Sequence, residues 1–486
     1  MKKYTKVITI VLLLYSVAAK AQTGTFVPEL AKFDTAMLNL ISQYNIPGAQ
    51  LAITYQGRIV YNRGFGYADT LSHTPVQPGN VFRIASLTKP ITCIAIMYLY
   101  EHGLLNLDDK VFGPDGILND PAFQEIQDPN VAKITIRHLL THSAGWDSNI
   151  SGDPVFNPYN IAIAMNVPPP ADPEAIVKFV LARHTLDFEP GTQFQYSNFG
   201  FCVLGRVIEK ITGESYENFV RNTILGPLGI SDMYSGKNLK DNRLKNEVVY
   251  YDYTGAPLTK SVYDNVTLVP WPYGGINIEG MDSNGGWLAS AGDLCKLLLG
   301  IDGLPATTDI ISQETNDIMS QPTNINSSYA LGWGIDPQKN LWHRGSIQGT
   351  TTEMVRGSNQ VNWALLLNSR PADASQLNSA VDNFVWNLIP SIGKWPAGDI
   401  PTAIGNQDNH SQTGIYPNPS NGRFTIHSNS PFDSVTIYDT RGEIVGSVKA
   451  GNNKAGFINV SYLPKGVYFL QIGNGQDLRT VKIIIE

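Results

Sequence analysis

Two helical segments stand out in the pattern of apolar and polar positions along the chain. After the stretch RIASLTKPIT, apolar residues recur from Ile91 at the spacing of a helix face, and Gly103 follows as a stop signal. The segment Phe199–Gly213 repeats this period and also ends at a glycine. Ser86 is therefore predicted at a helix entrance, with Lys89 one turn later on the same face.

Strand-like patterns lie on both sides of these helices. The segment Ala49–Asp69 is predicted to form paired strands joined at Gln56-Gly57, and the later stretches ALGWGI and VNWALLLN also have strand character. Early and late strands could close one sheet around a helical middle. This order predicts an α/β fold with an added helical lobe and a cleft between the two, where ligand sites usually lie.

The pattern changes after Pro390. Residues 395–414 are polar, rich in Gly and Pro and without periodicity, which predicts a linker. Residues 415–486 alternate polar with β-branched or aromatic positions between turn residues, which predicts a small all-β sandwich. Because its aromatic residues alternate regularly with polar ones, we expect these four in its core: Phe424, Tyr438, Phe457 and Tyr468.

The first residues have the layout of a secretory signal. Lysines precede an apolar run, and small residues follow at Ala19 and Ala21. We expect removal of residues 1–21, so that the main domain spans residues 22–394. No stretch reaches the roughly 18 apolar residues of a membrane helix, which favours an exported protein without a transmembrane segment.

Composition narrows the possible functions. A chain of 486 residues predicts two or three domains. The net charge is −7 and the basic residues are spread, so we expect no nucleic-acid partner. Cys93, Cys202 and Cys295 each lie in an apolar context without a CxxC pair, which favours buried thiols over a disulfide framework. We expect neither a cofactor nor a metal.

Three short motifs carry candidate chemistry. The pattern SxxK occurs at Ser86 and at Ser391, but the second lies between prolines, so only the first holds its two side chains at a fixed separation. The unreactive alternative for Ser86 is a helix N-cap beside a solvated lysine. The motif Tyr196-Ser197-Asn198 directly precedes a predicted helix, and His343-Arg344-Gly345 follows a strand-like pair.

Two further patterns bear on the kind of site. His138 and His142 lie four residues apart, a spacing that suits zinc, but no acidic third ligand stands at a recognisable offset. We therefore expect structural roles for both. A GxSxG elbow is lacking, which argues against an α/β-hydrolase.

Taken in order, SLTK, YSN and HRG resemble the motifs of the serine β-lactamase and penicillin-binding protein superfamily. The likeness is to the branch of class C β-lactamases, D-alanyl-D-alanine carboxypeptidases and related esterases, and it extends through ITIRHLLTHSAGW and FEPGTQFQYSNFGFCVLGRVIEKITGESY over roughly residues 30–390. The resemblance implies a β-lactamase/transpeptidase-like fold, with a mainly antiparallel sheet flanked by helices and a helical lobe.

The resemblance also implies roles for these residues. Ser86 would be the nucleophile of an acyl-enzyme, with Lys89 and Tyr196 as its catalytic partners. Either a Tyr196 phenolate or a neutral Lys89 could be the general base, and the sequence leaves both open. The substrate-binding residues implied are Asn198 for an amide of the substrate, His343 and Gly345 on the edge strand, and the backbone N–H of Ser346, which with that of Ser86 would form the oxyanion hole.

The HRG motif departs from the KTG of many β-lactamases. An unperturbed imidazole at His343, with a pKa of about 6.5, is only about a quarter protonated at pH 7 and attracts a carboxylate less than an ammonium does. Arg344 could restore that charge, but strand alternation points it to the opposite face unless the edge strand twists it into the cleft. We therefore expect esters or D-amino-acid peptides to be turned over faster than penicillins and cephalosporins.

The C-terminal run, from IYPNPSNGRFTI to TVKIIIE, resembles the type A sorting domain of the type IX secretion system of the Bacteroidota. It departs from many members in ending on Glu486 instead of a basic residue. The resemblance implies the type IX machinery as a partner of residues 415–486 and a secreted or cell-surface location. The alternative is an adhesion or carbohydrate-binding module.

Two classes of function follow. The first is a secreted serine hydrolase acting on a small-molecule or peptide substrate: an ester, a D-amino-acid peptide or a β-lactam. The second is a catalytically weak protein that binds peptidoglycan fragments or penicillin. The intact Ser86, Lys89 and Tyr196 favour the first, because a pure binder has no need of a base beside its serine.

Overall fold

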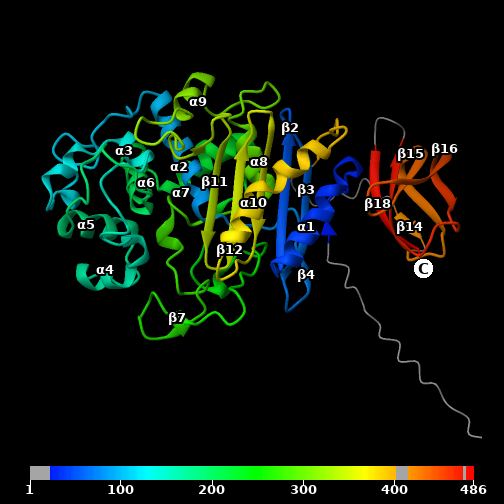
Figure 1. The fold of residues 1–486 in the computed structure, drawn as a ribbon, viewed down its shortest axis with the longest axis horizontal. Coiled ribbons are helices and arrows are strands. Elements are labelled where there is room, and N and C mark those ends of the chain that lie inside the picture. The colour runs from blue at the N-terminus through cyan, green and yellow to red at the C-terminus, as the bar shows by residue number, and fades with distance from the viewer. Residues whose placement is uncertain (1–21, 401–413, 417, 474–477, 486) are drawn as a thin grey trace, which may run out of the picture.

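The computed structural model describes residues 22–400, 414–416, 418–473 and 478–485. The predicted signal segment and residues 401–413 of the predicted linker lie outside the described residues. Figure 1 shows the main domain as a central sheet with a helical lobe on one side, and the C-terminal strands as a separate body on the other.

The central sheet is antiparallel throughout and follows the order β1-β3-β2-β13-β12-β11-β10, with β4 paired to β3. Helices α1 (Ala31–Gln43) and α10 (Ser375–Leu388) pack on one face, and α8 (Ala291–Leu299) lies against β2 and β13 on the other. The predicted fold is confirmed. The strands are β1 (Gln22–Thr23), β2 (Gly48–Tyr55), β3 (Arg58–Asp69), β4 (Thr74–Pro75), β10 (Gly334–Ile335), β11 (Leu341–Ile347), β12 (Thr350–Arg356) and β13 (Val361–Leu367).

The hairpin and the closure of the sheet follow the sequence pattern. Gln56 and Gly57 adopt φ values of 49° and 78°, the left-handed two-residue turn that matches the twist of a hairpin. Strand β13 pairs with β2, so late and early strands do join in one sheet. Of the stretch ALGWGI, only the last two residues form a strand.

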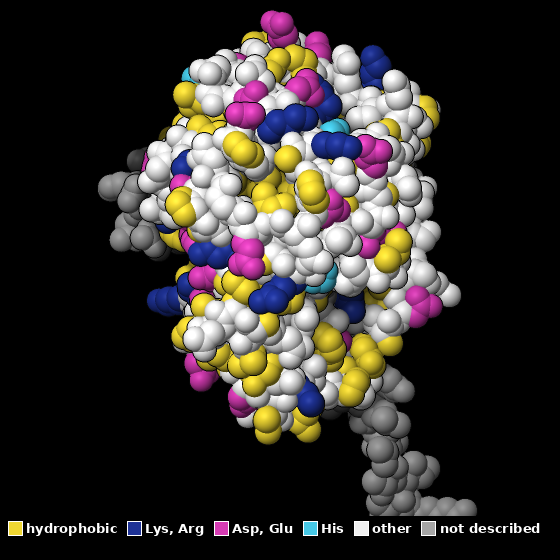
Figure 2. Space-filling view, turned by 90° about the vertical axis from the view of Figure 1, so that its left-hand side faces the viewer, with side chains coloured by type: hydrophobic (Ala, Val, Ile, Leu, Met, Phe, Trp, Pro, Cys, Tyr) yellow, Lys and Arg dark blue, Asp and Glu magenta, His cyan; other side chains and the backbone are white. Residues whose placement is uncertain are grey.

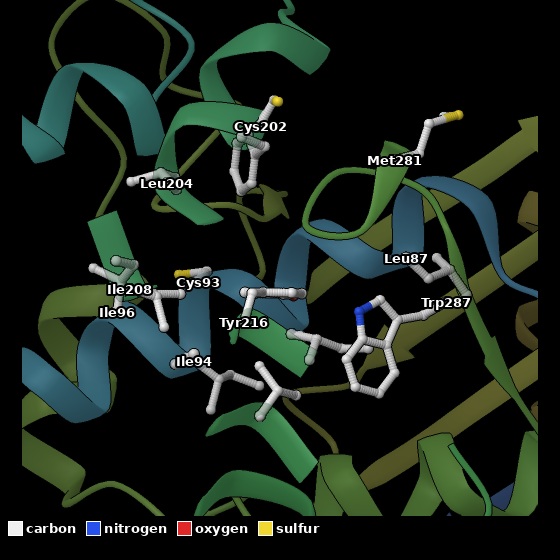
Figure 3. Close-up of a cluster of buried hydrophobic side chains, with 14 of the residues drawn as sticks. Leu87, Cys93, Ile94, Ile96, Cys202, Leu204, Ile208, Tyr216, Met281 and Trp287 are labelled. Carbon is white, nitrogen blue, oxygen red and sulfur yellow. The ribbon is translucent and has the colours of Figure 1, made fainter. Parts of the chain in front are cut away.

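The helical lobe surrounds α2 (Thr88–Glu101), the helix predicted after Ser86. Figure 3 shows Cys93, Ile94 and Ile96 of α2 within a cluster of buried side chains that includes Ile208 of α6 and Tyr216 of α7. Burying each large aliphatic side chain contributes about 1.5–3 kcal/mol to folding stability, so this packing holds α2 firmly in place. The lobe helices are α3 (Ile136–Leu140), α4 (Pro158–Met165), α5 (Pro173–Arg183), α6 (Asn198–Thr212) and α7 (Tyr216–Phe219), with α9 (Gln313–Met319) beside α2.

Helix and cysteine predictions agree with the structure. Helix α6 ends at Gly213, whose φ of 72° lets it cap the helix in the left-handed conformation. Cys93, Cys202 and Cys295 are buried free thiols.

Smaller elements complete the main domain. Strand β9 pairs with β5 and β6 beside the start of α2, and β7 pairs with β8. Their bounds are β5 (Phe82–Arg83), β6 (Tyr234–Ser235), β7 (Thr259–Lys260), β8 (Leu268–Val269) and β9 (Trp287–Ala289).

One face of the molecule carries charged side chains of both signs, in agreement with the spread of charges along the sequence. Figure 2 views the molecule from the side of the helical lobe, where Lys and Arg side chains stand among Asp and Glu side chains. In the part of the chain that the structure describes, no helix combines the length and apolar character needed to cross a bilayer.

The C-terminal region is all-β, as predicted, and its described residues form five strands of one antiparallel sheet. Phe424 and Tyr468 are buried in its core, as predicted. Tyr438 lies outside this core, contrary to the prediction: it is half-buried and packs against the cluster of Phe26, Ala31 and Phe469. The prediction for Phe457 is wrong: it is 67% exposed, because its neighbour Ile458 pairs with Phe424 on the core face and alternation turns Phe457 away. The strands are β14 (Gly414–Tyr416), β15 (Arg423–Tyr438), β16 (Ile444–Asn459), β17 (Gly466–Gly473) and β18 (Leu478–Ile485).

The first residues of the predicted linker pack onto the main domain. The Trp395 ring stacks on Tyr55 with centroids 4.5 Å apart. The Ile59 N–H donates to Asp399 Oδ1 at 2.9 Å, and the Ile400 N–H donates to the Ile59 carbonyl at 2.8 Å. Residues 395–400 therefore extend the main domain by a short strap along β2 and β3.

The contacts of this strap predict which truncated chain keeps the stability of the main domain. A chain ending at Ile400 should keep the main domain's thermal transition and activity, whereas one ending at Lys394 loses the Trp395 stacking and both hydrogen bonds of the strap. We expect its melting temperature to fall by about 2–6 °C relative to the longer chain. Differential scanning calorimetry of the two chains measures this, and equal melting temperatures would show that the strap contributes nothing.

Candidate functional site

Ser86 lies in a tight turn, Ala85–Leu87, that leads directly into α2. Ala85 has a φ of 48°, a left-handed conformation that is strained for a residue with a Cβ. The turn is held at the Ile84 carbonyl, which accepts from the Leu87 N–H at 3.2 Å and from Thr352 Oγ1 at 2.9 Å. The Ser86 side chain caps no helix, so the N-cap alternative is wrong.

Lys89 is completely buried, so the alternative of a solvated lysine is also wrong. Its Nζ donates to the Asn284 carbonyl at 2.7 Å, to Asn198 Oδ1 at 2.7 Å and to Ser86 Oγ at 3.2 Å. Burial lowers the pKa of Lys89 from 10.5 to about 7, and the charge of Asp153 opposes this shift. Near neutral pH a substantial fraction of Lys89 is therefore an unprotonated amine beside the serine hydroxyl.

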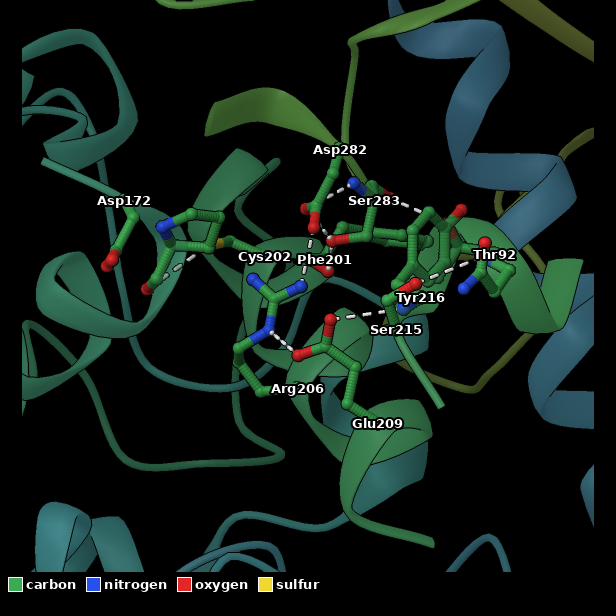
Figure 4. Close-up of polar contacts among 12 residues, drawn as sticks. Thr92, Asp172, Phe201, Cys202, Arg206, Glu209, Ser215, Tyr216, Asp282 and Ser283 are labelled. Carbon is green, nitrogen blue, oxygen red and sulfur yellow. Dashed lines mark hydrogen bonds and ion pairs between the residues drawn. The ribbon is translucent and has the colours of Figure 1, made fainter. Parts of the chain in front are cut away.

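A polar network holds the segment that binds Lys89. Figure 4 shows Arg206 of α6 between Glu209 and Asp282. Its Nε lies 2.6 Å from Glu209 Oε2, and its Nη2 lies 2.5 Å from Asp282 Oδ2. Ser283 is fixed in turn by its Oγ, which donates to the Phe201 carbonyl at 2.9 Å. Because the neighbouring Asn284 carbonyl receives the Lys89 ammonium, this network sets the position of the amine.

Tyr196 and Asn198 meet Lys89 from the start of α6. The Lys89 Nζ lies 4.8 Å from the centroid of the Tyr196 ring. Although 37% of the Tyr196 surface is exposed, burial of the phenol raises its pKa, and a hydrogen bond with Ser86 only partly opposes this. Asn198 accepts from Lys89 and donates through Nδ2 to Asp153 Oδ2 at 2.7 Å, and its Nδ2 has a second N–H beyond the one given to Asp153.

Strand β11 brings His343, Gly345 and Ser346 close to the turn that holds Ser86. A Cβ on Gly345 would lie 2.3 Å from both the Ile84 carbonyl oxygen and Thr352 Oγ1, so only glycine allows β11 to approach the turn of Ser86 this closely. Ser346, the next residue, is exposed, and His343 is buried. The structure thus brings together all seven residues expected from the sequence.

Comparison with known proteins identifies the fold that carries this arrangement. The model of the beta-lactamase family matches residues 28–384. The chain belongs to the beta-lactamase family. A second model, the secretion system C-terminal sorting domain, matches residues 414–486 and indicates a secreted protein.

The following relatives of this beta-lactamase family member have low sequence identity to it. Penicillin-binding protein 4* of Bacillus subtilis (strain 168) is 26% identical over 338 residues, which cover 65% of this chain and 67% of that protein. The D-amino acid amidase from Ochrobactrum anthropi SV3 superposes with a TM-score of 0.56 at 22% identity, covering 74% of this chain and 99% of the amidase. EstCE1, a hydrolase with promiscuous acyltransferase activity, gives 0.55 at 22% identity over 70% and 94% of the two chains. These two superpositions show the fold alone.

In this member of the beta-lactamase family, His343 ends a chain of directed hydrogen bonds. The Ser197 N–H donates to His142 Nδ1 at 3.1 Å, which places the His142 proton on Nε2, 3.0 Å from the Tyr329 oxygen. The Tyr329 hydroxyl then donates to His343 Nε2 at 3.3 Å, and His343 Nδ1–H donates to the Arg344 carbonyl at 2.7 Å. This assignment satisfies every group with both imidazoles neutral.

The hydrogen-bond chain corrects the expected charge of His343. Burial, and then the nearby charge of Lys89, lower the pKa of His343 to about 3, so it is neutral at pH 7 instead of a quarter protonated. Arg344 does lie on the opposite face, where it pairs with Asp382 at 3.2 Å. Neither residue of the motif offers a positive charge to a substrate.

Asp153 and Tyr329 are site residues that sequence reasoning missed. Asp153 lies in a polar Gly-Asp-Pro loop, and its Oδ1 also accepts the Val155 N–H at 3.1 Å, as an ordinary helix cap does. Tyr329 precedes the stretch ALGWGI and is 8% exposed. Neither position belongs to a periodic pattern, so only the tertiary contacts with Asn198 and His343 reveal them.

The paired histidines have structural partners. His138 closes a capping box with Thr135 at the start of α3, and His142 belongs to the chain through Tyr329. Among the residues described, no cluster of three His, Cys, Asp or Glu side chains is close enough to hold a metal ion.

Proposed function

We propose that this protein is a secreted serine hydrolase that forms an acyl-enzyme on Ser86. Its expected substrates are esters or peptides ending in a D-amino acid, in preference to penicillins. The observation that carries the proposal is the Lys89 amine, which is buried, has a pKa of about 7 and lies 3.2 Å from Ser86 Oγ. A base with a pKa near the working pH is what general-base catalysis requires.

The proposed acylation step begins at this pair. Neutral Lys89 takes the proton of Ser86 Oγ as that oxygen attacks the substrate carbonyl. The backbone N–H groups of Ser86 and Ser346 stabilise the oxyanion, supported by the close approach of β11 to the Ser86 turn at Gly345. Lys89 becomes an ammonium held by the Asn284 carbonyl and Asn198.

Tyr196 is proposed to deliver a proton to the leaving group. Its raised pKa keeps the phenol protonated at neutral pH, which favours Lys89 over a Tyr196 phenolate as the base of the free enzyme. Tyr196 is 37% exposed and its ring centroid lies 4.8 Å from Lys89 Nζ, so its phenol is proposed to pass the proton to the leaving group and to recover one from Lys89. Water then releases the acyl group from Ser86 by the reverse path.

The C-terminal domain is proposed to address the protein to the type IX secretion machinery. The match of residues 414–486 to a secretion sorting domain supports this.

A substrate panel tests the proposed activity. The protein is labelled with a fluorophosphonate and with a fluorescent penicillin, and kcat/KM is compared for short acyl esters, D-Ala-D-Ala peptides, penicillins and cephalosporins. We expect labelling by the fluorophosphonate and a higher kcat/KM for short acyl esters than for penicillins, because neutral His343 does not attract the carboxylate of a β-lactam. Hydrolysis of penicillin near about 10⁶ M⁻¹ s⁻¹, the range of efficient enzymes, would contradict this preference.

A further inference from the structure

We propose that Asp153 is a positioning residue of the site: its carboxylate fixes the Asn198 amide in the orientation that receives Lys89, and it places a negative charge on the other side of that amide. This role rests on the proposed function, in which Lys89 is the base, and adds the group that stabilises the charged form of this amine.

Asp153 lies in the loop between α3 and α4, immediately before the 3-10 turn Pro154–Phe156. Its Oδ1 accepts the Val155 N–H at 3.1 Å, as the residue before such a turn commonly does. Val155 is itself buried in the core of the helical lobe. Capping thus uses one carboxylate oxygen and anchors the side chain, and the other oxygen, Oδ2, accepts from Asn198 Nδ2 at 2.7 Å.

The two partners of the Asn198 side chain allow its amide only one orientation. A lysine ammonium has only donors, so the amide oxygen must face Lys89 Nζ, which lies 2.7 Å away. An ionised carboxylate has only acceptors, so the amide nitrogen must face Asp153. An amide turned by half a rotation would set donor against donor and acceptor against acceptor. The Asp153 carboxylate therefore keeps the amide oxygen directed at Lys89.

No neighbouring cation pairs directly with the Asp153 carboxylate. Among the described residues it forms no ion pair with a Lys, Arg or His side chain. Burial raises the pKa of Asp153, and its hydrogen bonds with Asn198 and the Val155 N–H and the charge of Lys89 oppose this. Because both of its oxygens accept N–H groups, these contacts favour the ionised form.

Asp153 is the charged side chain that acts on Lys89. Its charge opposes the larger effect of burial, which lowers the pKa of the amine. Burial also keeps the other ionisable groups around the two residues uncharged near pH 7, because it raises the pKa of phenols and thiols and lowers that of imidazoles: Tyr196, Tyr329, Cys93, Cys202, His142 and His343. The stability of the Lys89 ammonium therefore depends on Asp153.

Variants that keep the capped turn but remove the charge test this role. Asparagine and serine begin helices about as well as aspartate does, so Asp153→Asn and Asp153→Ser should lose the charge and keep the Val155 contact. Asp153→Glu keeps the charge. Asp128→Asn is the matched control, because Asp128 also precedes a proline and caps a 3-10 turn, but its carboxylate bonds the N–H groups of Asn130 and Leu186, neither of them in the site.

Two measurements follow the Lys89 amine between about pH 5 and pH 9, on either side of its pKa of about 7. One is the rate constant of fluorophosphonate labelling. The other is the NMR titration of the Lys89 Cε signal in protein that carries carbon-13 at the lysine Cε atoms, assigned with Lys89→Met, and it requires no turnover.

Loss of the anion destabilises the ammonium, so both midpoints should move to lower pH in Asp153→Asn and Asp153→Ser. We expect a movement of about one pH unit, the lower end of the effect of a nearby opposite charge. Asp153→Glu should stay closer to wild type than either of these variants, and Asp128→Asn should match wild type.

The outcomes separate this role from a merely structural one and from the hydrolase itself. Slower labelling at every pH with unchanged midpoints overturns the role of Asp153, as does an equal movement in Asp153→Glu or Asp128→Asn. The thermal transition of each variant reports whether it is folded, and either charge-removing variant suffices for the test. A protein that is not labelled at any pH, but whose Lys89 signal moves as expected, would overturn the hydrolase and leave the role of Asp153 in place.

Discussion

The Ser86→Ala variant is expected to lose at least about 10⁴-fold in kcat/KM and all labelling by the fluorophosphonate, because the substitution removes the atom that forms the acyl-enzyme. The fold should survive. Ser86 is half-buried, its side chain caps no helix, and Lys89 keeps two of its three acceptors. Its melting temperature should therefore stay within a few degrees of wild type.

A matched control exists in the same chain. Ser391 begins the second SxxK, but it is exposed and its Oγ donates to the Leu388 carbonyl at 2.8 Å. Ser391→Ala should keep full labelling and turnover. Labelling of Ser86→Ala, or loss of labelling in Ser391→Ala with an intact thermal transition, would show that the nucleophile is elsewhere.

The Lys89→Met variant is expected to lose about 10²- to 10⁴-fold in kcat/KM, the usual contribution of a general base. Wild-type kcat/KM should rise with pH through an apparent pKa of about 7 as the Lys89 ammonium loses its proton, and this rise should be absent from the variant. Tyr196→Phe should be slower but keep the rise. The opposite pattern, a rise kept in Lys89→Met and lost in Tyr196→Phe, would make Tyr196 the base.

The lowered pKa of Lys89 also predicts how the stability of the protein depends on pH. The pKa of Lys89 is about 7 in the folded protein and near 10.5 when unfolded, so the folded state holds fewer protons between these values. Below pH 7, burial of the charged ammonium lowers the free energy of unfolding by its full amount. This destabilisation decreases as pH rises from about 7 towards 10.5. Wild type should therefore gain melting temperature relative to Lys89→Met between about pH 6 and pH 9, and a constant difference would show that Lys89 does not titrate near 7.

Much of the fold could be predicted because it depends on local patterns. The period after Ile91 defines α2, and the left-handed residues Gln56-Gly57 define the hairpin, since each is set by neighbours in the chain. The spacing of Ser86 and Lys89 needs only one helical turn to bring the side chains together. The exposed Phe457 was missed because alternation gives two faces but does not say which is the core.

The sequence by itself determined that a serine and a lysine share the start of a helix, in the motif order of the beta-lactamase family and ahead of a sorting domain. Only the tertiary structure decided their chemistry. The pKa of Lys89 depends on its burial, and its acceptors Asn198 and Asn284 lie 109 and 195 residues away. His343 is neutral because packing removes it from water beside Lys89, and a charge on a residue depends on its surroundings in space, which motif spacing does not encode.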